Sequence, residues 1–179
     1  MNHMKAKYAG TGKGIAPIGV VEVFDEDGDA IRETHNMVVL DGQRIMMSLF
    51  LSKLIENGSP AGTGDEYIEA ENIADNSLGI SFAYEANPST TVETMDADDI
   101  PSSAHDVTEG YSVEYSMAGT GVCLTLKTKL SGAKVHAFNE IMLMCKSTEG
   151  EKILFSRALI DPVFLGSDSS YMISYTLYF

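Results

Sequence analysis

The sequence has no tryptophan, only two cysteines, and no apolar run near the roughly 20 residues of a membrane helix. Cys123 and Cys145 are too few for a disulfide framework in a chain of 179 residues, and neither their spacing nor their context indicates a bond between them. The opening "MNHMKAKYAGTGKGIAP" lacks the apolar centre of a signal peptide. These absences predict a soluble protein, made in a cytoplasm, with no membrane partner.

Positive charge is also scarce. The net charge is −14, and the stretch from Leu54 to Leu126 has no lysine or arginine but fourteen acidic residues. Phosphate binding needs clustered Lys and Arg, so nucleic acid is excluded as the main partner. The acidic stretch has two interpretations: a solvated surface with long loops, or an electronegative face for a basic neighbour or divalent cations.

Motifs for catalysis and nucleotide binding are missing. "GTGKG" (Gly10 to Gly14) lacks the preceding strand and the Ser or Thr that a phosphate-binding loop needs after its lysine. No G-x-S-x-G motif surrounds any serine. Glu140 could be a buried partner for Arg157, but one carboxylate beside one arginine is a structural pair. The sequence therefore predicts no enzyme, no catalytic residues and no cofactor.

Metal-ligand patterns are weak. "DEDGD" (Asp25 to Asp29) has alternating carboxylates, but its glycine is at position four and Asn36 is at position twelve, unlike a calcium loop of the helix-loop-helix type. The sequence favours a hairpin tip there and predicts no metal ligands, with weak calcium binding at this tip or at "DADD" (Asp96 to Asp99) left open. None of the histidines has metal-site spacing with a cysteine or another histidine; they are His3, His35, His105 and His136.

The chain divides into a basic, glycine-containing arm (1–16) and a single β-rich domain (17–179). Two β-rich runs flank Asp27-Gly28, which indicates a hairpin. Apolar residues at helical spacing predict one α-helix near residues 43–56, with Asp41 as its cap. Residues 59–109 read as a long acidic loop region in which "SLGISFAYEA" is the one good strand.

Alternating strands dominate after Gly110. "YSVEYSMA", "VCLTLKTKL" and the last residues, where Ile173, Tyr175 and Leu177 share a face, each predict a strand with one buried side. "NEIMLMCKSTEGEKILFSRALIDPVF" predicts a hairpin whose pairing ends at Pro162, and the last strand is expected to close the sheet. About eight strands and one helix predict a mainly β, antiparallel, sandwich-like domain.

The order of these pieces resembles a family. "HNMVVLDGQRIMMSLFLSKL" is similar to the N-x-V-x-x-x-G-x-x-x-x-x-x-L start of a helix in tailed-bacteriophage virion proteins. "LGISFAYEANPSTTVETMDADDI" resembles the strand and acidic turn that follow in those proteins. The chain from Asn139 to Phe179 resembles their ending: E-[IA]-[GM]-L-x, a turn, L-[FL]-[AS]-R, a proline and a closing strand. It differs from them in "ISFAYEA", where I-G-x-G-T is usual, and in Met142, where a small residue is usual.

The resemblance covers roughly Val20 to Phe179 and implies a non-enzymatic virion structural protein. Such a protein would assemble in multiple copies with itself and with other virion proteins, on the capsid surface or at the head–tail or tail region. The chain has no repetitive shaft sequence, which favours a capsid-surface or head–tail position over a fibre. The alternative is a receptor- or glycan-binding module of a phage tail whose acidic loops could hold calcium.

Overall fold

The structure is a computed structural model that describes residues 18–39, 41–46, 72–88, 100–107, 111–118 and 121–178. These residues form mainly β-structure, which confirms the predicted antiparallel β class. The predicted arm (1–16) lies outside them. The nine strands are β1 (Ile18–Phe24), β2 (Ala30–Val38), β3 (Gly79–Ala83), β4 (His105–Val107), β5 (Ser112–Ala118), β6 (Gly121–Ser131), β7 (Ala137–Lys146), β8 (Lys152–Phe164) and β9 (Ser170–Tyr178).

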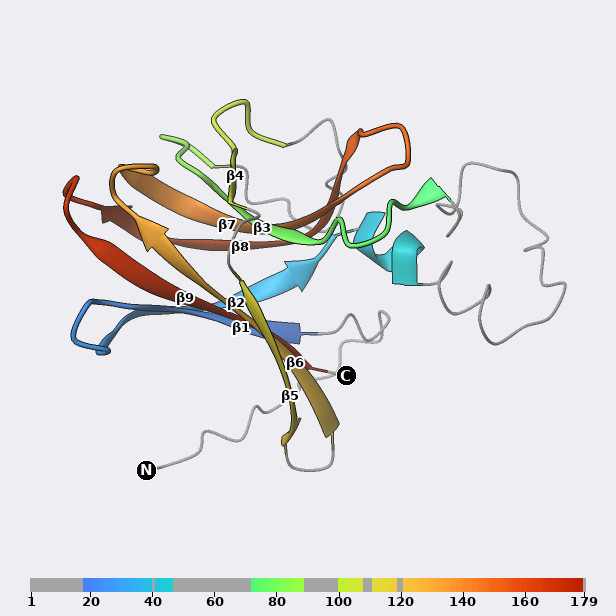
Figure 1. Cartoon of the computed structure of the whole chain (residues 1–179), viewed down its shortest axis with the longest axis horizontal. Helices are drawn as coiled ribbons and strands as arrows, with labels where there is room; N and C mark the ends of the chain where they lie inside the picture. Colours follow the sequence, from blue (N-terminus) through green and yellow to red (C-terminus); the bar gives the residue numbers. More distant parts are fainter. Residues whose placement is uncertain are drawn as a thin grey trace, which may run out of the picture.

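All nine strands belong to one sheet, in the order β4-β3-β7-β8-β2-β1-β9-β6-β5, so the two stacked sheets of a sandwich are not observed. Figure 1 shows this sheet strongly curved, with β3, β7 and β8 above β1, β9 and β6. The hydroxyl of Tyr111, just before β5, donates a hydrogen bond of 2.7 Å to the carbonyl of Leu78, just before β3. The curvature therefore brings the two ends of the sheet together, as in a partly closed barrel.

The core fills the concave face. Inward residues of distant strands share one apolar cluster, including Val21, Phe82, Leu126 and Ile173. The rings of Phe82 and Phe138 meet edge to face, with centroids 5.3 Å apart. The concave face of one curled sheet thus supplies opposite walls of the core, and Ile45 of the helical segment 41–46 also packs into it.

A smaller apolar cluster covers the outer face of β3, β7 and β8. It contains Val39, Ala83, Met142, Met144 and Leu154, with Ile100 and Ala104 packed against it. Residues 138–145 of β7 are consequently all buried, on both faces. A near-continuous apolar run such as "IMLMC" is what a strand buried on both faces requires.

Helical residues 41–46 follow β2. The helix begins at Asp41, two residues before the predicted start, so Asp41 belongs to the first turn, where it accepts a hydrogen bond of 2.9 Å from Nη1 of Arg44. The predicted remainder, 47–56, lies outside the described residues. A Cβ on Gly42 would collide with the backbone carbonyl of Phe155, so this glycine lets the helix approach β8.

Three details of the predicted strands are wrong. β8 continues past Pro162 to Phe164. The register of β8 against β7 shifts between the partners of Phe138 and Glu140, and Pro162 lies in this irregular part of the ladder. A backbone N–H is not needed for pairing there, so the proline is tolerated. β9 does not close the sheet but lies between β1 and β6. The predicted loop region contains β4 as well as β3, because a strand of three residues is too short for any periodicity.

Candidate functional site

The β5–β6 hairpin carries apolar side chains that stand in solvent. Figure 1 shows this hairpin projecting from the curled body of the sheet. Val113 and Tyr115 of β5 and Val122 of β6 lie on its apolar side and are 43%, 78% and 47% exposed. We call these three residues the hairpin patch. An exposed apolar group at the end of a sheet is typical of a surface that contacts another molecule.

The sequence predicted that this face of β5 would be buried. Further along the same face, Leu126 and Leu130 of β6 are indeed buried in the concave core. The alternation identified the strand and its apolar side correctly. It could not show that the hairpin extends beyond the body, because alternation carries no information about what lies opposite a strand.

A shallow polar groove lies on the other side of the same strands. Its walls come from β1, β5, β6 and β9: Glu22, Phe24, Glu114, Thr125, Lys127, Met172, Ser174 and Thr176. Nζ of Lys127 is 2.7 Å from Oε2 of Glu114, and the hydroxyls of Thr125 and Thr176 are 2.9 Å apart.

The groove is lined by two carboxylates, Glu22 and Glu114, and by one lysine, Lys127, which pairs with Glu114. Burial raises the pKa of the Glu22 carboxyl, Glu33 raises it further and Lys127 lowers it. Hydroxyls and a neutralised ion pair offer hydrogen bonds but no activated nucleophile, so the groove is suited to contact with a polar surface.

A polar group also lies inside the core. Nδ2 of Asn36 donates to Oγ of Ser156 at 3.4 Å, and Oγ of Ser156 is hydrogen-bonded to the hydroxyl of Tyr175. Burial raises the pKa of Tyr175 to about 12, against the smaller, opposite effects of hydrogen bonds with Ser156 and Asn36. The phenol therefore keeps its proton at neutral pH, and these three residues hold strands together inside the core.

Glu140 and Arg157 form the pair that the sequence suggested. Nη2 of Arg157 is 2.5 Å from Oε1 of Glu140, and Nε donates to Oε2 at 2.9 Å. The side chains are 1% and 0% exposed, respectively. Two-point pairing in a buried position fixes the register of β7 against β8, and it leaves no open face where a substrate could bind.

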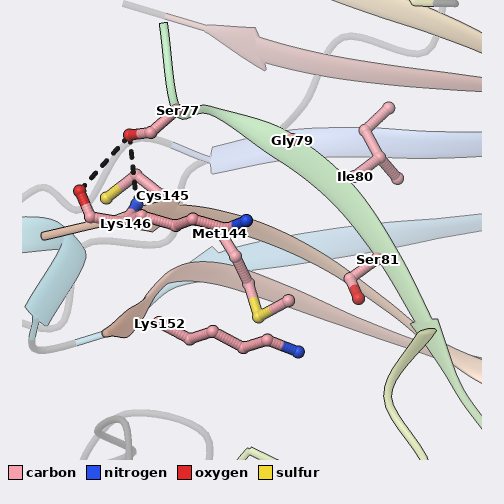
Figure 2. Close-up of a pocket in the computed structure, with 8 residues that line it drawn as sticks. All are labelled: Ser77, Gly79, Ile80, Ser81, Met144, Cys145, Lys146 and Lys152. Atoms are coloured by element: carbon pink, nitrogen blue, oxygen red, sulfur yellow. Dashed lines mark hydrogen bonds between the residues drawn. The ribbon is translucent and has the colours of Figure 1, made fainter. Parts of the chain in front are cut away.

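A narrow cavity lies beside the start of β3 (Figure 2). Ser77 bridges its rim: the N–H of Lys146 donates to Oγ of Ser77 at 3.0 Å, and that hydroxyl donates to the carbonyl of Lys146 at 3.4 Å. Cys145 lines the same cavity, and burial raises the pKa of its thiol to about 11, with a smaller contribution from Asp41 and an opposing backbone hydrogen bond. A thiol that stays protonated at neutral pH is a poor nucleophile.

The acidic tip at residues 25–29 is the hairpin turn that the sequence favoured. Oδ1 of Asp25 accepts the N–H groups of Asp27 and Asp29 at 3.0 and 2.9 Å, and Gly28 has a φ of 87°. Oε1 of Glu26 accepts the N–H of Ser170 at 2.7 Å, which ties the turn to β9. Two of these carboxylates thus already stabilise the backbone.

Other candidate residues are scattered. The described part of the chain holds no group of three or more residues able to bind a metal ion. His35, His105 and His136 stand on different strands or turns, while His3, "GTGKG" and "DADD" lie outside the described residues. Cys123 and Cys145 are both buried and both free thiols.

Within the ranges that the structure describes, no helix has the length and apolar character needed to cross a membrane. Comparison of the chain with protein-family models, with curated proteins and with solved structures found no match.

Proposed function

We propose that this chain is a non-enzymatic structural protein of a tailed-bacteriophage virion, assembling in multiple copies on the capsid surface or at the head–tail or tail region. The observation that carries the proposal is the hairpin patch on the projecting β5–β6 hairpin, with Tyr115 78% exposed. A subunit that functions by packing against neighbours needs such a surface and needs no activated group.

The motif residues of the family resemblance have structural roles in the fold. Asn36 is buried, Gly42 allows close approach to the backbone of Phe155, and Glu140 pairs with Arg157 in the interior. These positions maintain the curled sheet itself. The motif residues therefore support the proposal only through the scaffold of this chain, and the virion role is a proposed extension from that scaffold to assembly.

Labelling the particle tests the proposal directly. Antibodies raised against the purified chain, coupled to gold, should decorate purified virus particles from the strain that encodes it at regular, repeated positions. Mass spectrometry of the same particles should find its peptides in many copies. Particles that are infectious and free of the chain would overturn the proposal.

A receptor- or glycan-binding module of a phage tail is the second candidate. The polar groove favours it, because hydroxyls, the Glu114–Lys127 pair and the ring of Phe24 are groups that sugars can contact. If acidic loops hold calcium for this role, calcium should raise the melting temperature, and an Asp25→Ala/Asp27→Ala variant should lose that increment. The increment is compared within each variant, because Asp25 also stabilises its own turn.

A further inference from the structure

Among the residues that the structure describes, β5 is the last strand of the sheet and pairs on one side only, with β6. Exposed edge strands usually carry lysine, proline or a bulge that blocks further pairing. Residues 112–118, "SVEYSMA", contain neither lysine nor proline, and their register with β6 is regular from Ser112 to Ala118. Their one charge is Glu114, whose side chain is 56% exposed beside Lys127. This edge is open to another strand.

The amino-terminal segment has a complementary pattern. In "MKAKY", residues 4–8, Met4, Ala6 and Tyr8 alternate with Lys5 and Lys7. Alternation of this kind gives a strand with one apolar and one basic face. The segment lies outside the described residues, and its charge is opposite to that of the acidic body, whose net charge dominates the chain at −14.

We propose that residues 4–8 of a second copy add to β5 as an antiparallel strand. With Ala6 opposite Tyr115, Tyr8 is opposite Val113 and Lys7 is opposite Glu114. The apolar side of the added strand then covers the hairpin patch, and its basic side meets the carboxylate of Glu114. Strand addition of this kind takes its affinity from main-chain hydrogen bonds and its specificity from alternate side chains.

A second copy suits the site better than the same chain. Tyr115 is 78% exposed in the single chain, so the site is open there. An added strand antiparallel to β5 would run in the same direction as β1, which lies three places from β5 and four from the added strand. The chain's own arm would have to reverse and recross those strands before it entered β1. This contact rests on the proposed multi-copy role, and it would join the copies to one another.

Cross-linking between two variants tests the register. The alignment places Ala9 opposite Ser112, and both residues are small. A tagged Ala9→Cys chain mixed with an untagged Ser112→Cys chain should give a disulfide-linked heterodimer under mild oxidation. Thr148→Cys, in the exposed β7–β8 turn, replaces Ser112→Cys in the control mixture and should give background only. The native cysteines are buried and do not compete.

Charge exchange tests the pairing of side chains. Glu114→Lys should weaken self-association in sedimentation about fivefold, as expected for a lost cross-strand ion pair, and Lys5→Glu/Lys7→Glu in the same chain should restore it. Glu149→Lys makes the same change of net charge in the distant turn and is the control. Deleting residues 1–14 should abolish this association and leave the melting temperature of the monomer nearly unchanged.

Equal cross-linking to positions 112 and 148 would overturn the inference, as would linkage only within one chain bearing both Ala9→Cys and Ser112→Cys. Self-association that survives deletion of residues 1–14 would do the same and would place the contacts on the sheet itself. These failures leave the virion role standing if the chain is found in particles. A chain that cross-links as proposed but is absent from particles would support the arm site and overturn the virion role.

Discussion

Gly19 and Asn36 lie opposite each other on β1 and β2, and the missing side chain of the glycine makes room for the amide of the asparagine. A Cβ at position 19 would overlap both the Asn36 amide and the backbone carbonyl of Thr176 on β9. Asn36 in turn reaches Ser156 of β8. One glycine therefore allows a buried polar contact that joins β2 to β8, which pair over only three residues, Asn36, Met37 and Val38.

Gly19→Ala should therefore lower the free energy of unfolding by about 1–3 kcal/mol, the usual cost of overpacking. Urea denaturation measures the change. Combining it with Asn36→Ala should relieve only part of the loss, because the Thr176 carbonyl does not move out of the way. Gly166→Ala is the matched control, since its added methyl would meet only the flexible hydroxyl of Ser169, at 3.3 Å. Equal losses for the two glycines would contradict this account.

The buried ion pair between Glu140 of β7 and Arg157 of β8 leads to a second prediction. Arg157→Met leaves the carboxylate of Glu140 in the interior without its partner and should cost about 3–5 kcal/mol of unfolding free energy. Adding Glu140→Leu removes the unpaired buried charge, so the double variant should regain most of the lost stability. Unfolding curves of the two single variants and the double variant form the test. If Arg157→Met costs below about 1 kcal/mol, the pair contributes little to the fold.

Local patterns predicted the strands well. The hairpin at Asp27-Gly28, the strand pairs at 112–131 and 137–164, and the buried face of Ile173, Tyr175 and Leu177 all follow from alternation and turn chemistry. Such signals act over a few residues, so one sequence is enough to read them.

The architecture depended on contacts that no local pattern encodes. Whether one sheet curls or two sheets stack is decided by distant pairs such as Tyr111 with Leu78, 33 residues apart. The same limit applies to the hairpin patch: Val113 and Leu126 face one another across the hairpin, yet one is half-exposed and the other is buried. Exposure of each residue is decided by its position relative to the curled body of the sheet, and that position depends on contacts along the whole chain.

The last strand, β9, provides a test of the core. Ile173 and Leu177 are 0% and 2% exposed, so replacing either by alanine should cost about 2–5 kcal/mol, the range for large-to-small changes in a core. Met172 of the same strand is 40% exposed, and Met172→Ala should cost far less. Thermal and urea unfolding of the three variants compare them. Losses below about 1 kcal/mol at both core positions would show that the inward face is misassigned.

The pH dependence of stability should reveal Tyr175. Burial raises its pKa in the folded protein to about 12, whereas in the unfolded chain the pKa is near the ordinary 10.0. Between these values the unfolded state loses the proton and the folded state keeps it. Stability from this group is therefore complete below pH 10 and falls as the pH rises through 10 to 12. Tyr175 should account for a loss of about 1–2 kcal/mol by pH 11.

Tyr175→Phe isolates this contribution from that of Cys145, whose thiol has a pKa raised to about 11 and therefore loses stability in an overlapping range. Phenylalanine keeps the ring in the core but leaves Ser156 without its hydroxyl partner, so the variant should be less stable at pH 8. The free-energy gap between the two proteins, from urea unfolding, should stay constant up to about pH 9 and then narrow, because only the wild type has the phenol to titrate. A gap that remains constant to pH 11 would mean that the phenol titrates alike in both states, and that it is reached by solvent rather than enclosed by the curled sheet.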